Sequence, residues 1–288
     1  MKDPDIRQNS ESFLSQDALN FTKDAVLKKC DLVDGVSDGL LEDPRQCDFD
    51  IVSLECATDQ NPLVDNSIVC LTPAQVQNVK NFYSGPSNTE TGHQIYPGFE
   101  VGSEAEWAVQ ETGLWIQYSI PILQNLVFRN LSYDYTKFNW GSDVDTLDKI
   151  AGPLIAEISP NLQAFRNRGG KMVVTQGWAD PFNAPTWPID QRNEMGKIFG
   201  SELDEFFSLF MVPGGGHCGG AAIYPQMPGT WHALDVLLPW VEQGKIPQEM
   251  LATEPADGSN STRKLCRYPK RAVHTEGSIN DWNSYICR

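Results

Sequence analysis

The sequence predicts an α/β fold with a parallel sheet, and two observations predict it. Met172–Thr175 and Leu209–Val212 are short apolar runs of the kind that form buried parallel strands. Between them, residues 189–200 (IDQRNEMGKIFG) have the pattern of a helix. A strand–helix–strand unit has a right-handed crossover, so the loops that follow its two strands lie at one edge of the sheet.

Length and composition restrict the classes of protein to consider. The chain has 288 residues, 40% of them hydrophobic, which is enough for one large domain or two medium ones. The formal net charge of −16 argues against nucleic acid or an anionic membrane surface as a partner. No apolar run reaches the ~18 residues that a membrane-spanning helix requires.

Cysteines and sequons indicate an extracellular, oxidised protein. The chain has seven cysteines and three acceptor sequons, at Asn20, Asn130 and Asn260. The N-terminal segment MKDPDIRQNSESF is polar and lacks the apolar region of a signal peptide. We therefore expect that further residues precede Met1 in the parent protein.

The N-terminal part begins with a helix and continues into an acidic loop. Residues 11–29 have nearly helical apolar spacing and lead into Cys30. The loop 30–47 has carboxylates at Asp31, Asp34 and Asp38, with glycines after two of them, and a Cys30–Cys47 disulfide would close it. Calcium binds six to eight oxygens, which such a curled chain can supply, although the spacing is not that of an EF-hand. An acidic surface turn is the alternative.

The next segments predict a second closed loop, a helix and an irregular region. Cys56 and Cys70 enclose a loop that a second local disulfide would close, and their spacing is too wide for a zinc site. Residues 73–82 predict a helix with Pro73 in its first turn. Residues 83–141 are irregular and rich in aromatic residues, which either pack a loop-rich domain or line a lid over a planar substrate.

The C-terminal part predicts two further helices and a third bridge. Residues 154–170 contain a short helical segment, and residues 231–245 form a strongly amphipathic helix. Cys266 and Cys287 are plausible partners that would pin the C-terminal tail.

Asp180 and His217 are the candidate catalytic residues. Each follows one of the two predicted strands, and His217 lies in the glycine-framed turn MVPGGGHCGG. In a Ser–Asp–His relay, Asp180 would orient the imidazole and His217 would act as general base. No serine lies in a G-x-S-x-G elbow, and Gly102-Ser103 is the nearest match, within the irregular region. We therefore expect the nucleophile to be absent from this chain.

Several segments together resemble the tannase and feruloyl esterase family over essentially the whole chain. The resemblance rests on the acidic loop, the strand and turn around Asp180, the HCGG turn, the helix end at 240–247 and the C-terminal segment 263–287. It implies a partial α/β-hydrolase domain over residues 153–288 and most of a loop-rich, calcium-binding lid domain over residues 1–152.

The resemblance also implies roles for individual residues. A structural calcium ion would be held by carboxylates and by two backbone carbonyls, from Asp31, Asp34, Val36, Asp38 and Leu40. The triad positions of the family fall on Asp180 and His217. Cys218 matches a cysteine that bonds to one directly before the nucleophilic serine, so its partner is expected upstream of residue 1. The local bridges would be Cys30–Cys47, Cys56–Cys70 and Cys266–Cys287.

The implied parent is a secreted carboxylic ester hydrolase for small aromatic esters, such as feruloyl or galloyl esters of plant cell walls and tannins. It would use acyl-enzyme chemistry, and this chain would be inactive alone because it lacks the serine and the oxyanion hole. Two segments depart from the family pattern near the site, Thr175-Gln176 and Phe182–Pro185. They are expected to alter substrate fit.

The alternative function is a secreted, calcium-stabilised binding module without catalysis. It would leave an intact Asp180–His217 pair without a purpose. An in-frame Cys-Ser elbow upstream of Met1 in the transcript would contradict this alternative.

Overall fold

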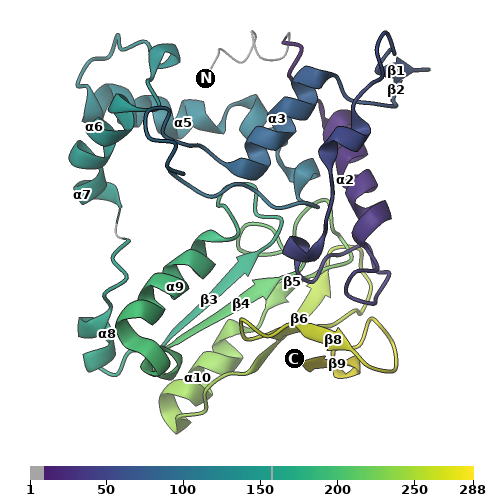
Figure 1. The fold of residues 1–288 in the computed structure, drawn as a ribbon. Helices are drawn as coiled ribbons and strands as arrows, with labels where there is room; N and C mark the ends of the chain where they lie inside the picture. The colour runs from purple at the N-terminus through teal and green to yellow at the C-terminus, as the bar shows by residue number, and fades with distance from the viewer. Residues whose placement is uncertain (1–9, 157) are drawn as a thin grey trace. The chain divides into compact units, whose positions relative to one another are not determined.

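The computed structural model describes residues 10–156 and 158–288, and the chain divides into two compact units. The first comprises Met1–Phe21, Asp50–Phe99 and Trp107–Ser159, and the second Thr22–Phe49, Glu100–Glu106 and Pro160–Arg288 (Figure 1). The acidic loop belongs to the second unit. The division into a lid over 1–152 and a hydrolase part over 153–288 stays a prediction.

The first unit is mainly helical. Its predicted helix at 73–82 is present and slightly longer, and the helix predicted over 11–29 runs over α2 (Gln16–Cys30), which continues into the second unit. Residues 83–141 contain more helix than expected. The regular elements, besides two short 3₁₀ turns at Ile51–Leu54 and Tyr135–Lys137, are β1 (Leu63–Val64), β2 (Ser67–Ile68), α3 (Pro73–Ser84), α4 (Ala108–Thr112), α5 (Leu114–Pro121), a π-helical turn (Ile122–Val127), α6 (Ser142–Ile150) and α7 (Gly152–Ile155).

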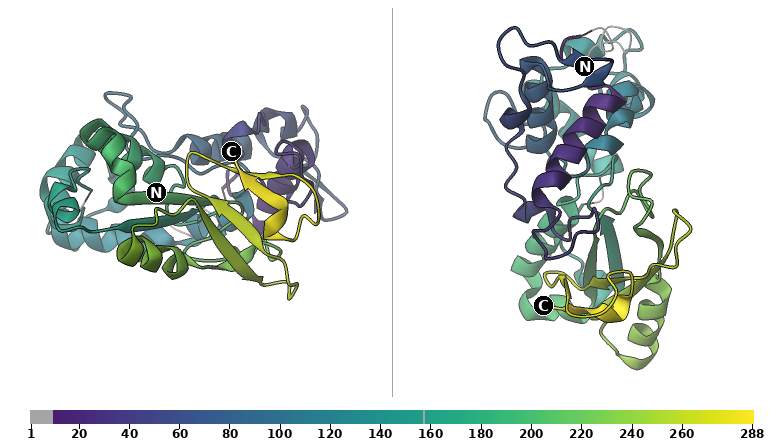
Figure 2. Two further views of the ribbon diagram at one scale, coloured as in Figure 1. Left: turned by 90° about the horizontal axis from the view of Figure 1, so that it is seen from below. Right: turned by 90° about the vertical axis from the view of Figure 1, so that its right-hand side faces the viewer.

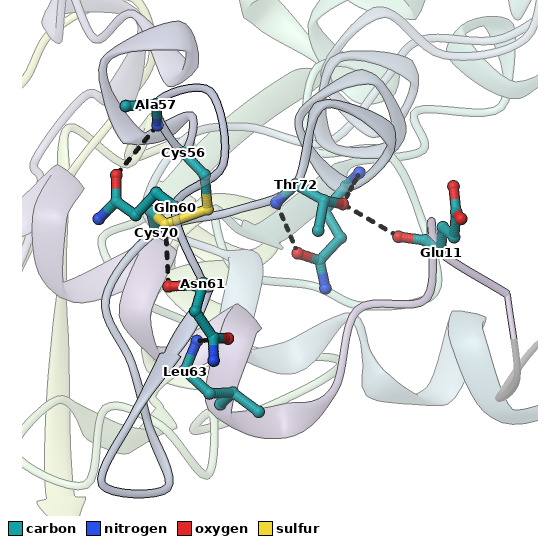
Figure 3. The surroundings of a disulfide bond; sticks show 9 residues. Glu11, Cys56, Ala57, Gln60, Asn61, Leu63, Cys70 and Thr72 are labelled. Atoms are coloured by element: carbon teal, nitrogen blue, oxygen red, sulfur yellow. Dashed lines mark hydrogen bonds between the residues drawn. A yellow bond between two sulfur atoms is a disulfide. The ribbon is translucent and has the colours of Figure 1, made fainter.

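The start of α3 shows why this helix was predictable. Thr72 precedes Pro73, accepts a hydrogen bond from the Gln75 backbone N–H, and receives the Gln75 side chain at its own backbone N–H, which is a capping box. The Thr72 hydroxyl also donates to the Glu11 carbonyl over 3.0 Å (Figure 3). The Cys56–Cys70 disulfide closes the hairpin of β1 and β2 directly before this cap.

Aromatic side chains form the centre of part of this unit. Trp107 is fully buried, stacks on Phe82 with ring centroids 4.7 Å apart, and meets Tyr83 edge-on. Phe128 stacks on Tyr133 in a second group. These contacts favour the packing interpretation for the aromatic residues named here, whereas Tyr118 is exposed. The side chain of Trp115 lies outside the described residues.

The second unit is built on the predicted strand–helix–strand arrangement. The strands β3 (Met172–Gly177) and β4 (Phe207–Val212) pair in parallel, in register from Met172–Phe207 to Gly177–Val212. The connecting helix α9 (Trp187–Phe199) begins two residues earlier than predicted and is followed by a 3₁₀ turn at Gly200–Glu205. Every residue of β4 is buried.

Helices α9 and α10 (Ala233–Gln243) cover opposite faces of this strand pair (Figures 1 and 2). Phe207, Leu209 and Met211 pack in one cluster with α9, and Phe210 and Val212 pack in another with α10. Alternate residues of a strand point to opposite faces, so β4 needs apolar side chains at both. The run FSLFMV, apolar except for Ser208, meets that need.

The C-terminal part contains strands that the sequence did not predict. The order β5–β6–β7 forms an antiparallel sheet, and β8–β9 forms a hairpin. Trp231 belongs to β5, so α10 starts two residues later than the predicted helix. The segment 154–170 contains one short helix, as predicted, at Gln163–Asn167, and it also includes the last two residues of α7. The remaining elements are α8 (Gln163–Asn167), β5 (Pro228–Trp231), β6 (Glu249–Pro255), β7 (Arg263–Cys266), β8 (Ala272–His274), β9 (Tyr285–Cys287) and 3₁₀ turns at Pro44–Gln46, Glu104–Glu106 and Trp282–Ser284.

The three expected disulfides are present, namely Cys30–Cys47, Cys56–Cys70 and Cys266–Cys287. Among the described residues, no helix is long and apolar enough to cross a membrane. Asn130 and Asn260 are exposed, whereas Asn20 is half-buried in α2. Glycosylation at these sequons stays a prediction. Residues 1–9 of the polar N-terminal segment lie outside the described residues.

Two charged side chains of the second unit, Arg263 and Glu100, have contrasting surroundings. Arg263 in β7 donates to Asp38 over 2.5 Å and to Glu42 over 3.0 Å, which ties the acidic loop to the C-terminal sheet. Within residues 10–156 and 158–288, no cation forms an ion pair with Glu100, and Arg45 pairs with Asp43 instead. Burial raises the pKa of Glu100 to about 7, against the attraction of Arg45 and with a contribution from Asp43.

We expect Glu100 to make the protein less stable as pH rises from about 4.5 to about 7. The folded state holds the Glu100 proton more tightly than the unfolded state, so folding is penalised once the carboxyl must ionise. Glu100→Gln should remove this decline and raise the free energy of unfolding above pH 7 by about 2 kcal/mol. Urea unfolding at pH 5 and pH 8 measures the effect. Glu276→Gln, at an exposed position, is the control, and equal responses of both variants would contradict the prediction.

Candidate functional site

The ends of β3 and β4 bring the two predicted catalytic loops together. The backbone N–H of Trp178 donates to the Val212 carbonyl over 3.0 Å, and that of Ala179 donates to the Gly215 carbonyl over 2.8 Å. The chain segment after β3 is therefore bonded to the turn that carries His217. Gly177 permits this approach, since a Cβ atom there would lie 2.1 Å from the Gly215 carbonyl oxygen.

Asp180 and His217 form a hydrogen-bonded pair. His217 Nδ1 lies 3.0 Å from Asp180 Oδ2 and 3.2 Å from Oδ1. A carboxylate can only accept, so Nδ1 carries the hydrogen and Nε2 is the basic nitrogen. Asp180 is 3% exposed, whereas the His217 side chain is 44% exposed. A buried carboxylate that orients an accessible imidazole is the arrangement of a general base.

Three neighbouring residues fix the Asp180 carboxylate. The backbone N–H groups of Phe182 and Asn183 donate to Oδ1 over 2.8 and 3.1 Å, and the buried Gln176 amide donates to Oδ2 over 3.1 Å. The Phe182 ring also meets the His217 ring edge-on at 4.9 Å.

Sequence reasoning had noted Gln176, Phe182 and Asn183 only as departures expected to alter substrate fit. Their contacts with Asp180 and His217 were not predicted. The turn Asp-Pro-Phe-Asn after a strand was the available signal, because an Asp side chain commonly accepts from backbone N–H groups two and three residues on.

Among the described residues, no serine hydroxyl hydrogen bonds to His217 or Asp180. Ser103, the nearest sequence match to a nucleophile, is buried and donates to the Glu100 carbonyl over 2.6 Å. The Cys218 thiol is exposed and free, and Cys218 has a left-handed φ of 60°. The described site therefore contains a histidine hydrogen bonded to a buried carboxylate, followed along the chain by a free thiol.

The acidic loop is held by its own backbone. Asp31 accepts from the Ser37 hydroxyl over 2.6 Å and from the Gly39 N–H over 2.7 Å. Asp34 accepts from the N–H groups of Val36 and Glu42, and Asp38 accepts from that of Leu40. Each carboxylate therefore curls the chain around itself.

The side chains of this loop offer carboxylate oxygens, which are ligands of the kind that calcium prefers. Burial raises the pKa of Asp34, and the nearby negative charge of Asp38 raises it further, so a cation would relieve a real electrostatic cost. Each bonded carboxylate oxygen still has a free lone pair for a hard cation. In the described part of the chain, no group of three or more His, Cys, Asp or Glu side chains is gathered closely enough to hold a metal.

Comparisons of the sequence and of the structure with known proteins all point to one esterase family. The family model described as "Tannase and feruloyl esterase" matches residues 1–288. An uncharacterized esterase from Xanthomonas campestris pv. campestris is 33% identical over 91% of this chain. Feruloyl esterase B from Aspergillus niger is 33% identical over 96% of it. The crystal structure of feruloyl esterase B from Aspergillus oryzae superposes with a TM-score of 0.84, at 25% identity over 97% of this chain.

The chain spans only part of these relatives. It covers 53% of the Xanthomonas protein, 55% of the A. niger enzyme and 58% of the A. oryzae crystal chain. The described structure shares the fold of the matching part, which agrees with the predicted α/β-hydrolase class.

We expect Gly177→Ala to separate the two loops that carry Asp180 and His217. The added methyl group meets the carbonyls of Gly215 and Gly216, which are backbone atoms that cannot move aside easily. The free energy of unfolding should fall by about 2 to 3 kcal/mol. Urea unfolding followed by circular dichroism measures it.

Gly196→Ala is the matched control, because a Cβ atom there meets nothing within 4 Å inside α9. It should raise stability by about 0.5 to 1 kcal/mol. A Gly177→Ala protein as stable as the unsubstituted chain would contradict the close approach of the two loops.

Proposed function

Because the chain belongs to the tannase and feruloyl esterase family, we propose that it supplies the Asp–His part of a serine esterase acting on aryl esters. The observation that carries the proposal is the hydrogen-bonded pair of Asp180 and His217 at the ends of adjacent parallel strands. The carboxyl ends of parallel strands are where such sheets collect their chemistry.

The mechanism follows from the orientation of the imidazole. His217 Nε2 takes the proton of a serine hydroxyl while the serine oxygen attacks the ester carbonyl carbon. His217 then gives that proton to the leaving alcohol, and an acyl-enzyme remains. Water, deprotonated in turn by His217, releases the acid. Asp180 stabilises the imidazolium in both steps, and the bonds from Gln176 and the 182–183 backbone keep its carboxylate in place.

The serine and the oxyanion hole are proposed to lie outside these 288 residues. The relatives are longer than this chain, and no serine hydroxyl of the described residues meets His217. Cys218 is proposed to bond to a cysteine beside that serine, which would link the nucleophile loop to the His217 turn. The chain alone is then inactive, because charge developing on the ester oxygen has no donors to stabilise it.

The proposed substrates are feruloyl or galloyl esters of plant material, and the proposed location is extracellular. The A. niger and A. oryzae relatives, both feruloyl esterase B, support the ester class. Three disulfides support an oxidising compartment. Acyl and alcohol preference would depend on the aromatic, loop-rich residues of the predicted lid.

A calcium ion is proposed to stabilise the acidic loop. Carboxylates of Asp31, Asp34 and Asp38 and the carbonyls of Val36 and Leu40 would hold it. Oxygen donors of this kind suit calcium, which would neutralise the mutual repulsion of Asp34 and Asp38. The role is structural, and no chemical step uses the ion.

A fusion protein tests the catalytic roles. The part of A. niger feruloyl esterase B that precedes its match to this chain would be joined in frame to residues 1–288, and hydrolysis of methyl ferulate and methyl gallate measured. We expect turnover that falls by about 10³-fold or more in His217→Asn and Asp180→Asn, since each removes a member of the triad.

His232→Asn is the control for the fusion, because His232 also pairs with a carboxylate, Asp235, at 3.2 Å. Its turnover should be unchanged. Activity that survives His217→Asn would disprove the role of His217. Turnover by the 288-residue chain alone, abolished by a serine-directed phosphonate, would disprove the absent nucleophile.

Calcium removal tests the loop. We expect EDTA to lower the thermal midpoint of the 288-residue chain, because a ligand at 100 times its Kd stabilises a protein by about 2.7 kcal/mol. Asp34→Ala should abolish this sensitivity, and Asp48→Ala, at an exposed position of the same segment, should retain it. An unchanged midpoint in EDTA would favour the acidic surface turn.

A further inference from the structure

Arg45 lies between two aromatic rings of the second unit. Its guanidinium carbon is 5.2 Å from the centre of the Trp178 ring and 5.6 Å from that of Tyr268. Nη1 also donates to the Tyr268 hydroxyl over 3.4 Å. A guanidinium over an aromatic face is attracted by the ring quadrupole, most strongly at tryptophan. Arg45 therefore holds the Trp178 ring from one side.

The guanidinium itself is fixed in place. Nε and Nη2 donate to the two carboxylate oxygens of Asp43, each over 2.8 Å, in a bidentate pair. Asp43 is also the N-cap of the 3₁₀ turn that carries Arg45, and Cys47 of the Cys30–Cys47 disulfide ends that turn. This segment therefore presents the guanidinium to Trp178 in a defined orientation.

Trp178 depends on such support because its own polar atom has none. The side chain is 4% exposed, and its indole Nε1 has no hydrogen-bond partner among the described residues. A buried, unsatisfied N–H favours any movement that would let it reach water. Packing and the cation of Arg45 are what oppose that movement.

A movement of Trp178 would displace Asp180, which lies two residues further along the chain, and so would alter its hydrogen bond to His217. Trp178 and Ala179 are bonded through their backbone to Val212 and Gly215, and Asp180 follows. Pro44, next to Arg45, lines one small pocket together with Trp178, Ala179 and Gly214. The segment that carries Arg45 is therefore a direct neighbour of the residues that precede Asp180 and His217.

From these contacts we propose that Arg45 is a positioning residue for the Asp180–His217 hydrogen bond, acting through the Trp178 ring. The importance of this role for catalysis rests on the proposed function. It concerns a hydrogen bond within this chain, so it can be tested without any esterase activity.

The test measures the Nδ1–H proton of His217 by ¹H NMR on the 288-residue chain. The resonance is assigned by its disappearance in His217→Asn, and its exchange with water reports how firmly Asp180 holds it. Arg45→Met keeps the length of the side chain and removes the cation. We expect exchange at least about ten-fold faster in Arg45→Met.

Two controls separate positioning from general packing. Arg192→Met removes the other guanidinium on the Tyr268 ring, 5.7 Å from its centre. Tyr268→Phe removes the hydroxyl and keeps the ring. Both should leave the exchange rate unchanged. Where Arg45→Met lowers the thermal midpoint too far to be studied, Arg45→Lys retains the charge without the bidentate pair and should give an intermediate rate.

An unchanged exchange rate in a folded Arg45→Met or Arg45→Lys protein would overturn the proposal. Equal acceleration by Arg45→Met and Arg192→Met would also overturn it, because the effect would then come from the Tyr268 ring. Accelerated exchange in Arg45→Met, combined with a fusion whose activity does not need His217, would leave the positioning role standing and reject the proposed function.

Discussion

The parallel pairing of β3 with β4 is the constraint on which the site depends. Its register aligns Gly177 with Val212, so the two strands end at the same level of the sheet and the loops that follow them meet. The absence of a side chain at Gly177 then allows backbone bonds from one loop to the other. Asp180 and His217 are distant in sequence, and this pairing makes them neighbours.

Charged side chains connect the acidic segment to the rest of the second unit at two points. Arg263 reaches into the loop from β7 and pairs with Asp38 and Glu42. Arg45 reaches out of the same segment to the rings of Trp178 and Tyr268. Both guanidiniums are themselves bonded to carboxylates, which reduces the cost of removing charge from water, fully for Arg263 and in part for Arg45. The segment is thereby anchored to two separate sheet regions.

The sequence predicted those elements whose structure is determined by residues close together along the chain. Pro73 in the first turn of α3, the apolar run of β4 and the glycine-framed turn at His217 each express their structure within a few residues. The strands β5 to β9 were missed because their burial follows no regular alternation, from the mixed pattern of β6 to the fully buried β7. In addition, β5 pairs with β6 across the intervening helix α10. The same reason hid the support of Asp180 by Gln176, and the stacking of Arg45 on Trp178. These contacts exist only after the chain has folded.

The order of the cysteines has a consequence for how this chain oxidises. The six bonded cysteines pair with their immediate neighbours along the sequence, at separations of 17, 14 and 21 residues. Short loops close at a smaller entropic cost than long ones, so chance encounters in the unfolded chain already favour the native partners. Cys218 falls between the second and third pairs, far from any competitor. Oxidation can therefore reach completion and still leave one thiol available for a later bond.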